Sequence, residues 1–172
     1  LDGVRRALEA GAFAELGVNA LWLSPVYTNP DGDFPGLDGH AYSSYHGYWP
    51  IAPRTLEDKL GAEADLDALV ASAHARGIRV LFDVVPNHVH EQHPYVKDHP
   101  GWVNHRASDC VCGQGSCDWG GHIQDCWFAP YMPDMDWRDA DAARTLADDV
   151  AWWIDRFDGD GIRIDAVPMM PR

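Results

Sequence analysis

Three stretches of the chain place apolar residues at helical spacing, and each is followed by a short apolar run typical of a buried strand. The helical patterns are carried by Val4, Leu8, Ala12 and Leu16, then by Leu66, Leu69, Val70 and Ala73, and then by Ala143, Leu146, Val150, Trp153, Ile154 and Phe157. Strands are expected over 20–25, 78–85 and 161–167. Alternating helices and near-continuous apolar strands predict an α/β fold whose parallel sheet is covered by helices, either an eight-fold barrel or an open doubly wound sheet.

Two long irregular segments interrupt this order, and both follow the carboxyl end of a strand. They cover 25–55 and 86–139 and are rich in Gly, Pro, His and aromatic residues. In barrel enzymes the active site is built from loops at this end of the strands. No Gly-x-Gly-x-x-Gly follows a strand, which weakens a dinucleotide-binding sheet. We therefore predict about three units of a (β/α)8 TIM barrel.

The expected organisation has three parts. A first barrel segment covers 1–88, an inserted irregular subdomain covers 89–137, and a second barrel segment with its helix and strand covers 138–172. A complete barrel needs roughly 250 residues, and this chain has 172. We expect it to be truncated at both ends.

Composition and charge limit the kinds of partner. With 46% hydrophobic and 23% charged residues the chain has the balance of a globular protein, and its formal net charge is −14. Acidic surfaces repel phosphate backbones and anionic lipids, so we expect neither nucleic acid nor membrane as a partner. No run of 18 apolar residues and no basic-then-apolar leader is present in the sequence. A neutral substrate fits best.

The four cysteines all lie within one short, glycine-rich segment. They are Cys110, Cys112, Cys117 and Cys126. One or two disulfides are favoured over a structural zinc site, because Cys-x-Cys-x4-Cys-x8-Cys lacks the paired Cys-x2-Cys of common zinc sites. Three pairings remain open. Disulfides would imply an oxidising compartment, so we expect an extracellular or periplasmic location.

Polar residues that could carry chemistry close the second and third predicted strands. The sextet 83–88 reads Asp-Val-Val-Pro-Asn-His, and alternation would point Asp83 and Asn87 the same way. Arg163 and Asp165 lie two residues apart, so the guanidinium would favour the ionised carboxylate that a nucleophile needs. The alternatives are a capping Asn beside a surface His in the first case and a structural ion pair in the second.

Together these motifs resemble the α-amylase family, glycoside hydrolase family 13. The matching stretches are 17–25 (GVNALWLSP), 45–49 (YHGYW), 83–88 (DVVPNH), 132–136 (MPDMD) and 161–165 (GIRID). Each match is weak alone, but five in order across nearly the whole chain are specific. The resemblance implies an α-glucan hydrolase, most simply an α-amylase, that acts on starch or maltooligosaccharides, and we expect a monomer.

The resemblance also assigns catalytic roles. Asp165 matches the nucleophile that forms a covalent glycosyl-enzyme, and Arg163 matches the residue that orients it. Asp83 matches a carboxylate that steadies the site through the arginine. Retention of anomeric configuration follows from two successive displacements, with the catalytic carboxyl groups about 5–5.5 Å apart.

Four further residues match the substrate site. His88 matches a hydrogen-bonding residue at the sugar being cleaved, and Tyr48 matches an aromatic residue that stacks on the ring. His46 and Trp49 are neighbouring candidates in the same loop.

Structural calcium is the cofactor that the resemblance implies. Asn87 and Asp134 match ligands that pin the insert to the barrel, and the backbone carbonyl of Met169 falls where the family supplies another. Calcium accepts six to eight oxygen ligands, so more are needed. The sequence does not choose among Asp109, Asp118, Gln124 and Asp125, and Asp134 could instead cap a turn.

The chain also departs from the family. Pro168-Met169 replaces a Lys-His pair that reaches the leaving-group side, which leaves open a transglycosylase or an isomerising relative. No counterpart of the general-acid Glu precedes Arg172, so we expect the segment alone to bind weakly without turnover. A non-catalytic amylase-like binding module is the remaining alternative.

Other aromatic and histidine residues have simpler explanations. We expect Trp22, Trp152 and Trp153 in the core because they lie on strand or helix patterns. His90, His93, His99 and His105 are irregularly spaced, so we expect solvated or capping side chains rather than a transition-metal site.

Overall fold

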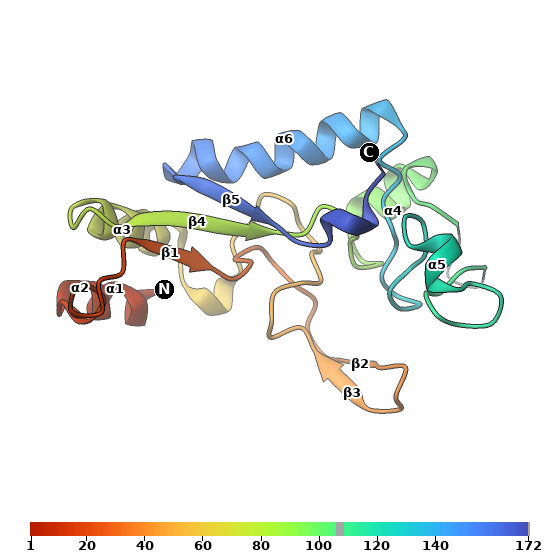
Figure 1. Ribbon diagram of the computed structural model, residues 1–172, viewed down its shortest axis with the longest axis horizontal. Helices are drawn as coiled ribbons and strands as arrows, with labels where there is room; N and C mark the ends of the chain where they lie inside the picture. The colour runs from red at the N-terminus through yellow and green to blue at the C-terminus, as the bar shows by residue number, and fades with distance from the viewer. Residues whose placement is uncertain (106–108, 172) are drawn as a thin grey trace.

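The computed structural model describes residues 1–105 and 109–171. Its main sheet has three parallel strands in the order β1-β4-β5, with bounds Ala20–Leu23, Arg79–Val84 and Gly161–Ile164. All three point the same way, toward the irregular segment that carries α4 and α5 (Figure 1). This is the parallel sheet that the apolar runs predict.

Helices cover the outer face of this sheet. α3 (Glu63–His74) and α6 (Ala140–Phe157) both contact β4, and α1 (Asp2–Glu9) packs on α3. The apolar face of α3 is buried as its spacing predicts. Asp139 begins α6 by accepting the backbone N–H groups of Asp141 and Ala142, both at 2.9 Å.

The first predicted helix is wrong in one respect, because the chain forms two helices there. α1 ends at Glu9 and α2 covers Ala12–Glu15. Gly11 lies between them with a φ of 83°, a left-handed conformation that glycine adopts without steric cost. Leu16, the last residue of the predicted stripe, is consequently exposed.

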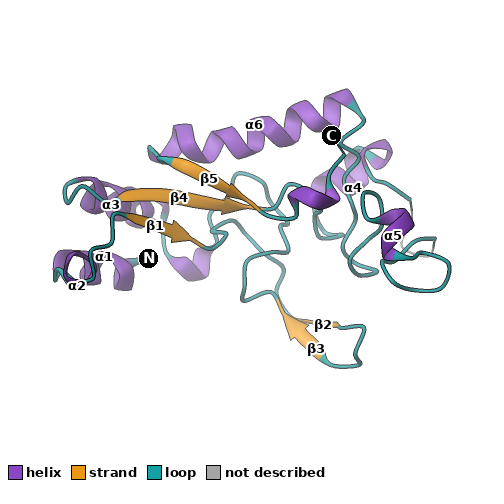
Figure 2. Ribbon diagram, in the orientation of Figure 1, coloured by secondary structure: helices purple, strands orange, loops and turns teal. Residues whose placement is uncertain are grey.

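The segment between β1 and α3 contains a hairpin that the sequence did not predict. β2 (Asp33–Pro35) pairs antiparallel with β3 (Ala41–Ser43), and the pair projects away from the sheet (Figure 2). A short 3-10 helix, η1 (Asp58–Leu60), follows before α3.

The segment between β4 and α6 is mostly loop. It contains α4 (Pro94–Asp98), η2 (Pro100–Trp102) and α5 (Trp119–His122). Disulfides join Cys110 to Cys117 and Cys112 to Cys126, which selects one of the three possible pairings. The four cysteines form a small buried cluster of their own with Phe128 beside it.

One buried network ties this segment to α6. Asp149 of α6 accepts the Tyr95 hydroxyl at 2.8 Å and pairs with Arg54 Nε at 2.8 Å. Burial raises the pKa of the Asp149 carboxyl, with these hydrogen bonds opposing the rise. No helix in the described ranges is long and apolar enough to cross a membrane.

Two of the histidines expected to be solvated or capping are buried. His93 accepts the Tyr95 N–H at the start of α4 and so does cap a helix. His90 is fully buried against Phe34 and Tyr131 and accepts the Gln92 N–H at 3.3 Å. Burial lowers the pKa of each imidazole to about 4, so both are neutral at pH 7.

Candidate active site

The register of the parallel strands brings Asp83 and Arg163 side by side. They are paired positions on β4 and β5, so their side chains leave the same face of the sheet. Arg163 Nη1 lies 3.0 Å and 3.1 Å from the two Asp83 carboxylate oxygens, and its Nη2 lies 2.7 Å from Asp165 Oδ1. One guanidinium therefore bridges both carboxylates at the carboxyl end of the sheet.

The two carboxylates differ in their access to solvent. The Asp83 side chain is 0% exposed, whereas that of Asp165 is 30% exposed. Asp83 also accepts the Tyr48 hydroxyl at 2.6 Å and the Trp22 Nε1–H at 3.0 Å. Asp83 is thus fully occupied by protein donors, while Asp165 keeps an open side that an incoming group can reach.

Trp22 corrects an expectation, because it does not pack into the core between the sheet and the helices. Its side chain is 58% exposed and its ring lies under the Arg163 guanidinium, 5.0 Å from centroid to Cζ. Leu21 and Leu23 face the helices instead. A tryptophan flanked by two core leucines points to the opposite face by alternation, and this signal was available in the sequence.

Tyr48 is held in a loop whose shape depends on Gly47 and Asn29. Gly47 has a φ of 88°, and a Cβ there would lie 2.6 Å from the Pro25 carbonyl oxygen. The Asn29 side chain donates to the Gly47 carbonyl at 3.1 Å and accepts the Trp49 N–H at 2.7 Å. These contacts fix the loop on both sides of Tyr48.

Burial and the hydrogen bond to Asp83 raise the pKa of Tyr48 to about 12, so its hydroxyl is a donor at neutral pH. His46 accepts the Tyr48 N–H at 3.0 Å, and its ring stacks on that of Tyr48. Trp49 packs edge-on against His46, with ring centroids 4.9 Å apart. The structure therefore places all three sequence candidates of this loop together.

His88 connects the same loop to the end of β4. Its Nε2 lies 3.1 Å from the Tyr48 carbonyl oxygen, which makes that nitrogen the donor. Burial lowers the pKa of His88 to about 4, and nearby Asp165 opposes this by its charge. The imidazole is therefore neutral at pH 7, and it lies within electrostatic reach of the Asp165 carboxylate.

Asn87 and Asp134 form a second polar group, separate from the arginine pair. β4 ends at Val84, so the predicted alternation from Asp83 to Asn87 is wrong and Asn87 lies in a turn. Asn87 Nδ2 donates to Asp134 Oδ1 at 3.1 Å, and Asn104 Nδ2 donates to Oδ2 at 2.8 Å. Burial raises the pKa of Asp134 to about 7.

This group has the chemistry of a hard-cation site. Asp134 is buried, and among the described residues no Lys or Arg side chain pairs with it. A bound cation would relieve the cost of ionising it, and amide and carboxylate oxygens suit calcium. Asn104 was missed at the sequence level, where an isolated Asn in an irregular segment carries no distinguishing signal.

Directly after Asp165 the backbone takes an unusual turn. Asp165 N–H donates to the Val84 carbonyl at 2.8 Å, and Ala166 then adopts φ 58° and ψ 22°. This left-handed residue begins η3 (Val167–Met169), whose first turn closes with the Met169 N–H bonded to the Ala166 carbonyl at 2.8 Å. Within the described residues, no hydrogen bond joins the Met169 carbonyl to Asn87 or Asp134.

Comparison with known proteins finds relatives that are similar over most of the chain. The chain is 32% identical over 164 residues to Alpha-amylase 3 of Schizosaccharomyces pombe, covering 91% of this chain and 28% of that protein. It is 28% identical to the cyclomaltodextrin glucanotransferase of Bacillus sp. (strain 1-1), covering 98% of this chain and 25% of that protein. The chain thus spans about a quarter of the length of these relatives.

Solved structures show the same fold. The α-amylase of Geobacillus thermoleovorans, solved with acarbose, superposes with a TM-score of 0.79 at 29% identity, covering 98% of this chain and 34% of that one. The three-stranded parallel sheet and its helices are therefore part of an α-amylase TIM barrel. The family model for the alpha amylase catalytic domain matches residues 1–112, and the chain belongs to the α-amylase catalytic-domain family.

Proposed function

We propose that this chain supplies the nucleophile side of a retaining α-glucan hydrolase site. The observation that carries the proposal is the bridge from Arg163 to both Asp83 and Asp165, with only Asp165 open to an incoming group. The buried Asp83 holds the Arg163 guanidinium in place, and the partly exposed Asp165, bound to the same guanidinium, is free to react. We place Asp165 as nucleophile and Arg163 as the group that orients it.

The proposed step is a displacement at the anomeric carbon. An Asp165 oxygen forms a bond to that carbon while the bond to the leaving sugar oxygen breaks, and that oxygen takes a proton from a general acid. Water then attacks the same carbon and gives a proton to the conjugate base of that acid while the bond to Asp165 breaks, which regenerates both carboxyl groups. Of these groups the chain provides the nucleophile and its support, while the proton donor comes from elsewhere in the catalytic domain.

We assign substrate contact to Tyr48 and its loop neighbours, which are linked to Asp165 through Asp83 and Arg163. Tyr48 presents an aromatic face for stacking on a sugar ring, with His46 and Trp49 supporting it. His88 lies at the same edge, and because its Nε2–H is donated to the Tyr48 carbonyl, its other ring nitrogen, Nδ1, is an acceptor. A starch-like or maltooligosaccharide substrate carries no charge, which suits a chain of net charge −14.

We further propose that calcium binds between Asn87 and Asp134, with the Met169 carbonyl as an additional ligand. The support is the buried Asp134 carboxyl, whose neighbours are amides. Calcium would supply a structural link between segments 1–88 and 138–172 of the barrel and the inserted subdomain 89–137. The disulfides support an extracellular or periplasmic location for the protein.

Transfer of the glucosyl group to a second sugar is a narrower alternative. Two observations support this alternative: the similarity to a cyclomaltodextrin glucanotransferase, and the Pro168-Met169 sequence after Asp165. Product analysis with labelled water distinguishes the two, since hydrolysis alone incorporates the label into the new reducing end.

Covalent trapping tests the nucleophile directly. A protein that carries this chain within its complete catalytic domain is treated with an activated fluorosugar of α-configuration, digested, and examined by mass spectrometry. We expect the sugar mass on the peptide that contains Asp165, and loss of labelling and hydrolysis in Asp165→Asn. The matched control is Asp155→Asn, an exposed carboxylate on α6. Unchanged hydrolysis in Asp165→Asn would rule out the proposal.

A further inference from the structure

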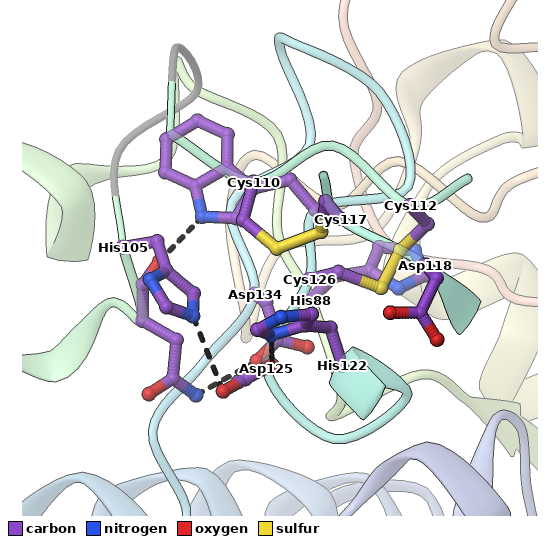
Figure 3. Close-up of a disulfide and its surroundings, with 12 residues drawn as sticks. His88, His105, Cys110, Cys112, Cys117, Asp118, His122, Asp125, Cys126 and Asp134 are labelled. Carbon is purple, nitrogen blue, oxygen red and sulfur yellow. Dashed lines mark hydrogen bonds and ion pairs between the residues drawn. A yellow bond between two sulfur atoms is a disulfide. The ribbon is translucent and has the colours of Figure 1, made fainter. Parts of the chain in front are cut away.

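Two histidines and a carboxylate meet beside the disulfide cluster, away from the arginine pair. His105 Nε2 lies 3.2 Å from Asp125 Oδ2, and His122 Nδ1 lies 3.2 Å from Asp125 Oδ1. Figure 3 shows both imidazoles turned toward the Asp125 carboxylate. The donor atoms of these three residues all lie within 4.8 Å of one another.

We propose that His105, His122 and Asp125 form a binding site for a transition-metal ion of the zinc class. Zinc bonds to imidazole nitrogen and carboxylate oxygen at about 2.0–2.2 Å, so neighbouring ligands around a tetrahedral ion lie about 3.3–3.5 Å apart. The two nitrogen–oxygen distances of 3.2 Å are close to this spacing. Each imidazole faces a different oxygen of the Asp125 carboxylate, and a bound ion would take the place of these two contacts.

The site is chemically distinct from the proposed calcium site nearby. Asn87 and Asp134 offer oxygen ligands only, whereas two of the three ligands here are imidazole nitrogens, which zinc, copper and nickel prefer and calcium does not. Asp125 lies near Asp134 in Figure 3, and its charge contributes to the raised pKa of Asp134. A cation held by Asp125 would reduce this repulsion.

Access and charge favour binding from solution. The three side chains are 34%, 37% and 27% exposed, so an ion reaches them without unfolding the segment. Cys110 lies close enough to be a fourth ligand, but its sulfur is bonded to Cys117 and is not a thiolate. Water would complete the coordination on the exposed side.

The proposed ligands come from both ends of the cysteine-rich segment, so a bound ion would also affect the stability of this segment. His105 follows Asn104, which holds Asp134, while His122 ends α5 and Asp125 precedes the disulfide-bonded Cys126. A bound ion would join the two ends of the cysteine-rich segment. This role is independent of sugar cleavage and of the assignment of Asp165.

Cobalt(II) titration tests the site, because its visible absorbance reports coordination number and ligand type. The protein is kept oxidised and saturated with calcium, and binding is followed by absorbance and by calorimetry. We expect one cobalt ion in a four- or five-coordinate environment without a sulfur-to-cobalt charge-transfer band. His105→Gln and His122→Gln should each weaken cobalt binding by a factor of about ten or more.

The matched control is His40→Gln, an exposed histidine in the β2–β3 hairpin, which should bind cobalt as the unmodified protein does. Circular dichroism and a thiol assay on each variant confirm that the fold and both disulfides persist. The proposal would be overturned if the protein did not bind cobalt, or if His105→Gln and His122→Gln bound cobalt as tightly as the unmodified protein does. A sulfur-to-cobalt band, or displacement of cobalt by millimolar calcium, would overturn it as well.

Discussion

Asp83 and Arg163 face each other across two parallel strands and share two contacts through one guanidinium nitrogen, at 3.0 Å and 3.1 Å. Asp83 is buried among donors, and Arg163 is about one-third exposed. The buried carboxylate thus anchors a residue whose second nitrogen reaches into the open part of the site. The two terminal nitrogens of Arg163 thus have different partners: Nη1 binds the buried Asp83, and Nη2 binds the partly exposed Asp165.

Replacing Asp83 should destabilise the protein strongly. Asp83→Ala leaves the Tyr48 hydroxyl and the Trp22 N–H without an acceptor and frees one side of Arg163, which should lower the free energy of unfolding by about 3 kcal/mol. Urea unfolding followed by fluorescence measures the change. Asp31→Ala, at a highly exposed carboxylate, is the control and should change stability by less than about 0.5 kcal/mol. Equal effects of the two substitutions would contradict the anchoring role.

The network around Asp149 should couple the segment between β4 and α6 to the barrel helix. Tyr95→Phe removes one hydrogen bond to Asp149 and should cost about 1 kcal/mol, whereas Asp149→Ala also leaves Arg54 unpaired and should cost more. Thermal unfolding compares these variants with Asp148→Ala, which changes the neighbouring exposed carboxylate. If Asp148→Ala destabilises as much as Asp149→Ala, the network has no special role.

The two disulfides should contribute unequally to stability. The Cys112–Cys126 bridge closes a separation of 14 positions and the Cys110–Cys117 bridge one of 7. Loop-closure entropy gives about 3 kcal/mol for the longer loop and about 0.5 kcal/mol less for the shorter one. Denaturant unfolding of the two paired Cys→Ser variants measures this order. A larger loss from removing the shorter bridge would show that loop length does not decide the contribution.

Asp134 should make stability and calcium dependence vary with pH. Its pKa in the folded protein is about 7, above the value of 3.8 for a free side chain, so the folded state keeps a proton that the unfolded chain releases. Without a cation, the contribution of the protonated Asp134 to the free energy of unfolding is therefore fully present below about pH 4 and is lost as the pH rises through 7. A cation favours the ionised form, so the rise in Tm on adding calcium should be larger at pH 8 than at pH 5.

The matched experiment uses Asp134→Asn and Asp155→Asn. Calorimetry at the two pH values, with calcium or with chelator, should show that only Asp134→Asn removes the pH-dependent calcium effect. A calcium effect that persists in Asp134→Asn would count against both the ligand assignment and the cause of the raised pKa.

The sequence predicted the sheet better than it predicted the site. Apolar spacing predicted β1, β4, β5, α3 and α6, because an element that packs in the core needs apolar residues at several regularly placed positions. The hairpin β2–β3 has only three residues in each strand and too short a pattern to recognise. The break at Gly11 was missed because the apolar spacing continues across it.

At the site, the motifs predicted that Arg163 lies beside Asp165 and that Asp83 acts through this arginine, but not that Tyr48 and Trp22 donate to Asp83. Trp22 was assigned to the core from its strand, although alternation placed it opposite Leu21 and Leu23. Asn104 and Asp134 meet across 30 positions, and such a pairing depends on how an irregular segment folds back. No local periodicity encodes it.

The left-handed turn at Ala166 limits which sequences can follow the proposed nucleophile. An L-residue with a side chain costs about 1–2 kcal/mol in this conformation, and β-branched residues fit it worst. Random mutagenesis of position 166 should therefore return mainly glycine, alanine, asparagine and aspartate among folded clones. Glycine at position 166 would adopt this conformation without steric cost and should stabilise the protein, but it would also give the preceding carboxylate more conformational freedom. Libraries that aim to alter the products therefore have few suitable residues at this position.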